Sequence, residues 1–100
     1  MKVLIGQVIK KESERNEKMI REYESLISEL PKGSLICRKN EYYYLKYREN
    51  GKLYDRYVGK DAAVIEEIKR KLALRHHYSE MLSALKREQK TICRLLEGLT

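Results

Sequence analysis

The chain has 100 residues, of which 37% are charged, and its formal net charge is +7. A chain of this length is expected to form one domain that buries about two-thirds of its unfolded surface. Without Phe or Trp, its core must be a thin one of Leu, Ile, Val, Met and Tyr. No stretch approaches the roughly 20 apolar residues of a membrane span, so we expect no membrane partner.

The first predicted element is a helix over residues 7–30, which contain neither Pro nor Gly. Apolar residues recur along it at the three-to-four-residue spacing of a helix face: Ile5, Ile9, Met19, Tyr23, Leu26 and Leu30. Glu12 and Asn16 interrupt this stripe, so we expect the first half of the helix to project away from the core. Residues 1–5 suit either a short strand or the start of the helix. Pro31 ends the helix because proline disfavours the α conformation at the residue before it.

Two runs rich in aromatic and branched residues, 42–48 and 52–58, flank Asn50-Gly51. These two residues tolerate the positive φ angles of a type I′ turn and therefore predict a two-residue hairpin loop. One face, expected to pack on the helices, then carries Tyr43 opposite Val58, Leu45 opposite Arg56 and Tyr47 opposite Tyr54. The other face, expected to meet solvent, carries Tyr44 opposite Tyr57, Lys46 opposite Asp55 and Arg48 opposite Leu53.

A third strand is expected over residues 34–38, joined to the hairpin by a tight turn near Asn40. The length of that turn decides which side chains of the strand face the helices. A two-residue loop directs Ile36 inward, and a three-residue loop directs Leu35 and Cys37 inward. Both alternatives remain open from the sequence.

The C-terminal part is expected to be helical from Asp61, which can cap the helix by accepting from its first amides. Its apolar stripe changes phase, from Ile65, Ile68 and Leu72 to Tyr78, Leu82, Leu85, Gln89, Ile92, Leu96 and Leu99. We therefore expect a bend or loop at residues 74–77 and a helical hairpin over residues 62–98. A single helix of about 36 residues is the alternative, and it would be unusual against a mean helix of about 11 residues.

The second stripe, with Gln89 at a seam position, resembles a coiled-coil face. In one interpretation, this stripe pairs with the first helix of the same molecule. In the other, it also pairs with a second copy of the chain in a homodimer. Together these elements predict an α+β domain over residues 1–100. It comprises a long N-terminal helix (1–30), a three-stranded antiparallel meander (34–58) and a C-terminal helical hairpin (62–98).

The residue types that carry catalysis or bind metals are sparse. Cys37 and Cys93 are too few for a disulfide framework and lack metal-ligand spacing. The adjacent His76 and His77 point about 100° apart on a helix and do not form an i, i+4 metal pair. With no glycine-rich phosphate loop either, we expect no enzyme, no metal, no cofactor and no small-molecule substrate. Reduced thiols are typical of a cytoplasmic protein.

Most of the positive charge lies in the middle of the chain. Residues 32–60 hold eight basic and three acidic residues, whereas residues 1–31 are neutral overall and residues 61–100 have a net charge of +2. Uncompensated cations attract polyanions, and aromatic rings stack on bases. Solubilising surface charge is the alternative interpretation.

The leading hypothesis is a nucleic-acid-binding protein, with DNA expected rather than RNA. The outer sheet face would bind through Tyr44, Lys46, Arg48 and Tyr57, and phosphates would be contacted at its edges by Lys39, Lys52 and Lys60. The rival hypothesis is a protein-interaction or regulatory module without direct nucleic-acid binding. Such a module would be a homodimer joined through the C-terminal helix or an adaptor, for example a phage-encoded inhibitor.

Several motifs resemble a bacterial and phage family of small uncharacterised proteins over roughly residues 30–96. They are Leu30-Pro31-Lys32-Gly33-Ser34-Leu35, Tyr42-Tyr43-Tyr44-Leu45-Lys46-Tyr47-Arg48, Gly51-Lys52 and Tyr57-Val58-Gly59-Lys60. The chain lacks the cysteine-rich insert that many members carry between the first two strands, so no metal site is implied there. The middle is also similar to the three-stranded arm-type DNA-binding modules of tyrosine integrases and to N-terminal parts of some transposases. That likeness implies a sheet laid in a DNA groove.

Overall fold

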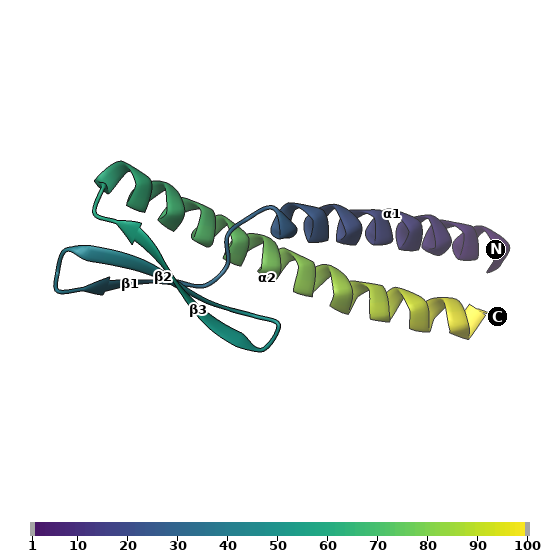
Figure 1. The fold of residues 1–100 in the computed structure, drawn as a ribbon. Helices are drawn as coiled ribbons and strands as arrows, with labels where there is room; N and C mark the ends of the chain where they lie inside the picture. The colour runs from purple at the N-terminus through teal and green to yellow at the C-terminus, as the bar shows by residue number, and fades with distance from the viewer. Residues whose placement is uncertain (1, 100) are drawn as a thin grey trace. The chain divides into compact units, whose positions relative to one another are not determined.

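The computed structural model describes residues 2–99, with side chains from residue 5 to residue 98 (Figure 1). Its elements run α1 (Lys2–Ser28), β1 (Ser34–Arg38), β2 (Tyr42–Glu49), β3 (Lys52–Gly59) and α2 (Ala62–Leu99). The α+β class, the N-terminal helix and the three-stranded antiparallel sheet are confirmed. Of the two alternatives for residues 1–5, the described residues 2–5 form the start of the helix and belong to α1.

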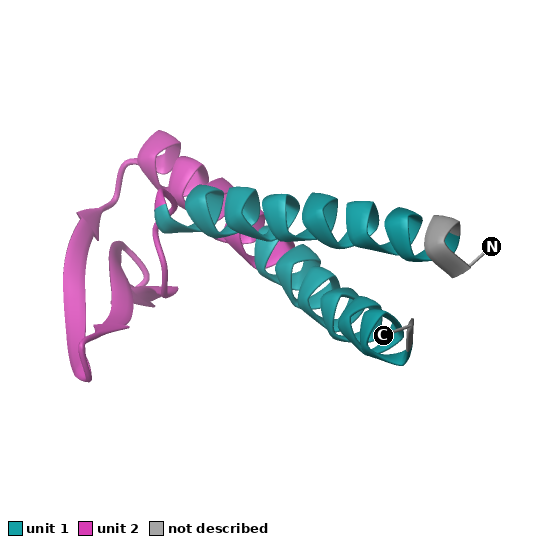
Figure 2. Ribbon diagram, turned by 90° about the vertical axis from the view of Figure 1, so that its right-hand side faces the viewer, with its two compact units in different colours: residues 1–28, 78–100 teal, residues 29–77 magenta. Residues whose placement is uncertain are grey.

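The predicted C-terminal helical hairpin is wrong, because α2 is one continuous helix of 38 residues. The chain divides into two compact units, and α2 contributes residues 62–77 to unit 2 and the rest to unit 1 (Figure 2). The apolar stripe of α2 changes phase at the point where the helix changes its packing partner. That partner is the sheet in unit 2 and α1 in unit 1. A change of stripe therefore marks a change of partner and not a break in the helix.

Unit 2, residues 29–77, contains the sheet, in which β2 lies between β1 and β3. The hairpin turns at Asn50 and Gly51, whose φ angles of 50° and 78° are both positive, as predicted. The expected register is confirmed from Tyr44 opposite Tyr57 to Arg48 opposite Leu53.

One predicted pair of the hairpin is wrong, because Tyr43 lies opposite Gly59 and not opposite Val58. The shift between Tyr43 and Tyr44 inserts Val58 as an extra residue in β3. Gly59 adopts a φ of +109°, which suits such an irregularity because glycine has no Cβ to clash.

The connection between β1 and β2 is the three-residue alternative. Arg38 pairs with Tyr42, so residues 39–41 form the loop, and Lys39 and Asn40 have φ angles of 56° and 59°. This register places Leu35 and Cys37 on the same side of the sheet as Leu45. The Cys37 side chain is nevertheless exposed.

The middle of the inner face of the sheet packs on the first part of α2, whereas Tyr54 and Arg56, which were expected to pack there as well, are exposed. Leu45 is only 4% exposed and Ile65 of α2 only 5%, and the Lys69 ammonium lies 5.8 Å from the centre of the Tyr43 ring. Asp61 caps α2, as predicted, by accepting from the Ala63 amide at 3.0 Å.

Just after the C-terminal end of α1, Leu30 takes part in a half-buried hydrogen bond within unit 2. The Arg75 guanidinium donates to the Leu30 carbonyl at 2.8 Å. This carbonyl directly precedes Pro31, and a carbonyl left without a helical partner requires another donor. Arg75 can therefore be half-buried on an unbroken α2.

Unit 1 pairs α1 with the end of α2 through a polar layer. Asn16 is 5% exposed and donates to the Leu85 carbonyl and to Gln89 Oε1, both at 2.9 Å. Gln89 Nε2 in turn donates to Ser13 Oγ at 2.9 Å and to Glu17 Oε1 at 3.1 Å. The expectation that the first half of α1 projects from the core is therefore wrong at Ser13 and Asn16, which form a buried polar seam, whereas Ile5 and Val8 nearer the N-terminus are more than half exposed. Leu99, the last residue of the predicted stripe, has a side chain outside the described part.

The thin core expected from the composition is confirmed over the described residues. The apolar side chains counted as buried are Leu45 and Ile65 in unit 2 and Leu85 and Ile92 in unit 1, and none is fully enclosed. Burying one such side chain stabilises by about 1.5–3 kcal/mol, so single changes in either unit are expected to be measurable.

Gly33 is expected to be irreplaceable. Its φ is +112°, and a Cβ added there would overlap the Lys46 carbonyl oxygen and crowd Tyr47. Gly33→Ala should therefore lower the free energy of unfolding by about 1–3 kcal/mol in urea denaturation. Gly6→Ala is the matched control: nothing lies within 4 Å of the added Cβ, and alanine favours the helix. Equal stabilities for the two variants would contradict this packing.

The polar layer of unit 1 should behave as one unit. Asn16→Ala and Gln89→Ala each remove a partner of the other residue, so their destabilising effects should not add. A double-mutant cycle by thermal unfolding should give a coupling of about 1 kcal/mol. Additive effects would show that the two amides do not support each other.

Candidate nucleic-acid interface

The sheet register separates two faces with different surroundings. The outer sheet face carries Ser34, Ile36, Arg38, Tyr42, Tyr44, Lys46, Arg48, Leu53, Asp55 and Tyr57. Tyr57 is 57% exposed and Leu53 54%, whereas Leu45 on the inner face is buried. The predicted residues Tyr44, Lys46, Arg48 and Tyr57 therefore share the face that does not pack on α2.

Three tyrosines gather at one end of this face. The Tyr44 and Tyr57 rings lie 5.3 Å apart between centroids, and the Tyr42 and Tyr57 rings lie 6.4 Å apart. The Arg38 guanidinium lies 4.7 Å from the Tyr44 ring centre, within cation–π range. A cation of β1 therefore lies against a cluster of aromatic rings from β2 and β3.

A shallow groove of about 510 Å³ lies beside these rings. Its lining comprises Arg38, Lys39, Tyr42, Tyr44 and Tyr57. Such a surface combines stacking faces with fixed positive charge, which is what single bases and phosphates require.

Arg38 also determines which cations of the outer face remain uncompensated. It binds Asp55 at 3.0 Å, although the backbone places Asp55 opposite Lys46. Asp55 is the one acidic residue among the described strand positions of this face. Lys46 and Arg48, neighbours on the same side of β2, consequently make no ion pair within 4.0 Å with the described part of the chain.

Sequence reasoning did not select Arg38 because the length of the β1–β2 turn was open. The three-residue loop directs Leu35 and Cys37 inward and hence Arg38 outward. Lys39 and Asn40 both adopt positive φ, but two such residues suit a two-residue turn equally well, so the sequence held no signal that decided the loop length.

The three predicted edge lysines are not gathered at one place. Lys39 lies in the β1–β2 loop and borders the groove. Lys60 lies at the same end of the sheet, 3.5 Å from Glu41 and 6.0 Å from the Tyr42 ring centre. Lys52 lies at the opposite end, beside the hairpin turn, and pairs with Glu49, so alternation directs it to the inner side.

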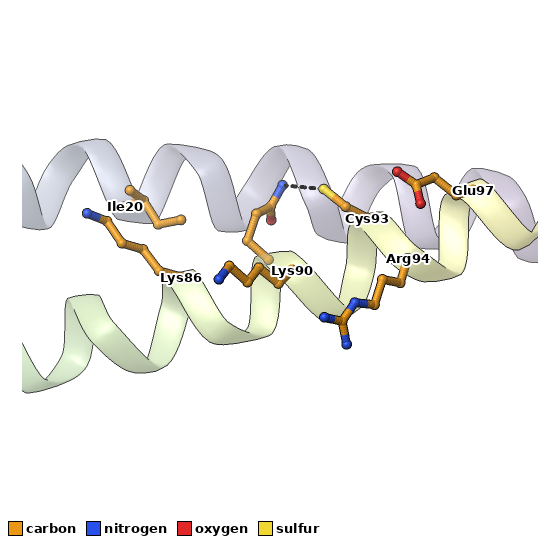
Figure 3. A pocket seen from close by; sticks show the side chains of 7 residues that line it. Ile20, Lys86, Lys90, Cys93, Arg94 and Glu97 are labelled. Atoms are coloured by element: carbon orange, nitrogen blue, oxygen red, sulfur yellow. Dashed lines mark hydrogen bonds between the residues drawn. The ribbon is translucent and has the colours of Figure 1, made fainter.

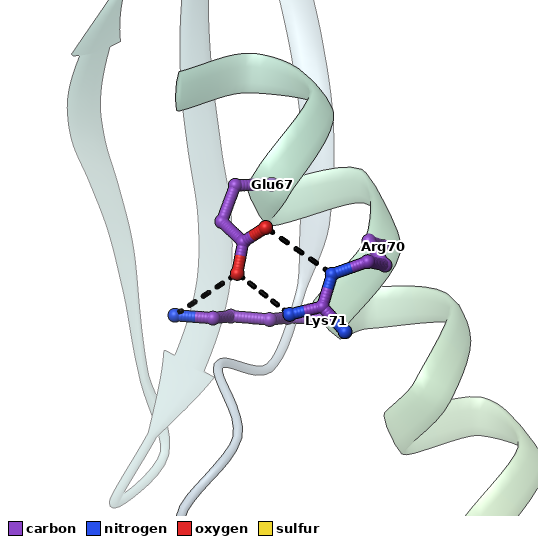
Figure 4. A network of polar contacts seen from close by, with 3 residues as sticks. All are labelled: Glu67, Arg70 and Lys71. Carbon is purple, nitrogen blue, oxygen red and sulfur yellow. Dashed lines mark hydrogen bonds and ion pairs between the residues drawn. The ribbon is translucent and has the colours of Figure 1, made fainter. Parts of the chain in front are cut away.

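The charges on the first turns of α2 are compensated, in contrast to those on the outer sheet face. Glu67 accepts two hydrogen bonds from Arg70, at 2.7 and 3.1 Å, and lies 3.8 Å from the Lys71 ammonium (Figure 4). The hydrogen bonds from Arg70 lower the pKa of the Glu67 carboxyl below its ordinary value. Lys69 likewise pairs with Glu66 at 3.6 Å.

The described residues include two histidines and two cysteines. No group of three or more His, Cys, Asp or Glu within them could hold a metal ion. Over the same residues, neither helix is long and apolar enough to cross a membrane. Cys37 and Cys93 are free and exposed.

No curated protein and no solved structure is significantly similar to the chain. The family described as Domain of unknown function (DUF6788) matches residues 9–70, which include most of α1, the whole sheet and the first turns of α2. The match extends over more than half of the chain and includes the candidate interface. The chain therefore belongs to the DUF6788 family.

Proposed function

We propose that the protein is a non-enzymatic nucleic-acid-binding protein that binds through its outer sheet face. The single observation that carries the proposal is the absence of a described counter-ion for Lys46 and Arg48 on the central strand. Their only acidic neighbour on this face, Asp55, is held by Arg38 at 3.0 Å. Two adjacent cations on a rigid strand are a ready acceptor for phosphates.

The tyrosine cluster extends this binding from phosphates to bases. Tyr57 is more than half exposed and borders the groove with Tyr42 and Tyr44. Aromatic rings stack on any base, with about 1–3 kcal/mol per stacked base. A two-stranded β-ribbon fits the major groove of B-DNA, and β2 and β3 form such a ribbon within the sheet. Because cations and exposed rings share one face, a nucleic acid is a better match for this face than a partner that binds through charge alone.

DNA rather than RNA is proposed as the ligand, in a cytoplasmic setting and in association with phage or other mobile elements. The similarity of Tyr47-Arg48, Gly51-Lys52 and Tyr57 to the arm-type modules of integrases supports this choice. Of the three edge lysines, Lys39 and Lys60 lie beside the tyrosine cluster and are proposed as phosphate contacts. Lys52 would contribute only from the hairpin end.

A protein-interaction module is the second candidate function. Leu53 and Tyr57 lie on the same face as the cations and are 54% and 57% exposed, which favours this second function. An acidic protein surface with an apolar centre would match that combination. Counterion release distinguishes the two candidates, because a nucleic acid gives a steep dependence of log affinity on log salt that most protein partners do not give.

The double variant Lys46→Ala/Arg48→Ala should weaken binding to random-sequence DNA. Each lost phosphate contact lowers the log–log salt slope by about 0.9, so a reduction of about 2 is expected. Fluorescence anisotropy at several salt concentrations measures both affinity and slope. Circular dichroism should show an unchanged fold, because Arg48 is exposed and Lys46 is only half-buried.

Lys11→Ala/Lys18→Ala is the matched control, since it removes two exposed cations from α1, where positive and negative charges are interleaved. Its salt slope should stay near that of the parent. If the sheet variant binds duplex and single strands as the parent does, the outer sheet face is not the interface. Parental heparin retention without a salt-dependent DNA affinity would favour the protein-interaction candidate.

A further inference from the structure

A second surface with uncompensated positive charge lies in unit 1. A groove of about 570 Å³ is lined by Ile20 of α1 and by a run of α2 residues that includes Lys86, Lys90 and Arg94 (Figure 3). We call these three cations the α2 basic stripe. In Figure 3 their side chains fan out from successive turns of the helix, and that of Arg94 points away from α1.

The stripe has a regular geometry. Its members recur every four residues, and a helix rises about 1.5 Å per residue, so their backbone positions span about 12 Å along the helix axis, with about 6 Å between neighbours, while their side chains diverge. Like charges at i, i+4 repel each other, so this arrangement opposes helix stability. No ion pair within 4.0 Å joins Lys86, Lys90 or Arg94 to the residues that the structure describes.

The first turns of the same helix show the opposite arrangement. Lys69 pairs with Glu66, while Arg70 and Lys71 pair with Glu67. Three consecutive cations are thus compensated there within one or two turns. The lack of ion pairs is therefore specific to the segment of α2 that carries the basic stripe and does not extend to the whole helix.

We propose that the α2 basic stripe is a second nucleic-acid contact, which takes phosphates of one strand in succession. A polymer with regularly spaced charges matches a line of regularly spaced cations. A lipid surface fits less well, because Gln89, Cys93 and Glu97 lie among the cations where a membrane-binding helix requires large apolar residues. The ligand class rests on the proposed function, but the surface does not involve the outer sheet face.

The test uses the full chain with Lys86→Gln, Lys90→Gln and Arg94→Gln combined. Anisotropy titration with a short random-sequence DNA duplex at several salt concentrations should show a log–log slope lower by about 2–3, at roughly 0.9 per phosphate contact. The melting temperature should not fall, because the substitutions remove like-charge neighbours. The charge-preserving variant Lys86→Arg/Lys90→Arg/Arg94→Lys should keep the parental slope, which separates lost charge from altered packing.

Lys11→Gln/Lys18→Gln/Arg21→Gln is the matched control, because it removes three exposed cations from α1 and should change the slope by less than the stripe variant. A stripe variant with the parental slope, or with no greater loss than this control, overturns the inference. A loss of binding to poly-glutamate but not to DNA also overturns it, since the stripe would then serve an acidic protein.

The two proposals can fail separately. If Lys46→Ala/Arg48→Ala keeps the parental slope while the stripe variant loses part of it, the stripe is supported and the outer sheet face is not. The reverse result retains the proposed function and removes the stripe. A parent protein without measurable affinity for DNA would overturn both.

Discussion

The hairpin turn at Asn50 and Gly51 is the constraint on which the rest of unit 2 depends. Successive side chains of a strand point to opposite faces, so a slip of one residue in the pairing of β2 with β3 would exchange the two faces. With positive φ at both turn residues, Leu45 is directed to α2 and buried, and Lys46 is directed outward. The division between a packed face and a cationic face follows from this one turn.

The position of Asp55 shows how the sheet distributes its few negative charges. Opposite Lys46 in the backbone register, it binds Arg38 of the other edge strand, across Tyr44. An exposed ion pair of this kind stabilises by about 0–1 kcal/mol, so its main consequence is electrostatic. It leaves positive charge on β2 at Lys46 and Arg48. The same imbalance recurs on the α2 basic stripe, whereas Glu66 and Glu67 compensate the first turns of α2.

Much of the sheet could be predicted from the sequence because local turn chemistry specifies it. Asn50-Gly51 fixed the hairpin register from Tyr44 to Arg48, and with it the shared face of Tyr44, Lys46, Arg48 and Tyr57. The β1–β2 loop was less determined, since two loop lengths fitted the sequence, and Arg38 was missed for that reason. The bulge at Val58 breaks the alternation of β3 just before the strand ends, and residue periodicity does not report such an extra residue.

The helices were harder to predict because their partners decide which residues are buried. The change of stripe on α2 suggested a break, yet the helix continues and meets a different element in each unit. On α1, Asn16 interrupted the apolar pattern but lies buried in a polar layer with Gln89. Hydrophobic spacing cannot identify a seam made of hydrogen-bonded amides. The proposed interface was accessible to prediction because it is formed by strand alternation, and Arg38 was the residue that tertiary context added.

The most direct test of the central claim is NMR chemical-shift mapping of the isotope-labelled protein during titration with a short DNA duplex. The account predicts that the largest shifts in unit 2 belong to Tyr44, Lys46, Arg48 and Tyr57, while Tyr43 and Leu45 on the inner face change little. Shifts concentrated on Tyr43, Leu45 and the first turns of α2, or no shifts in the sheet at saturating DNA, would contradict it.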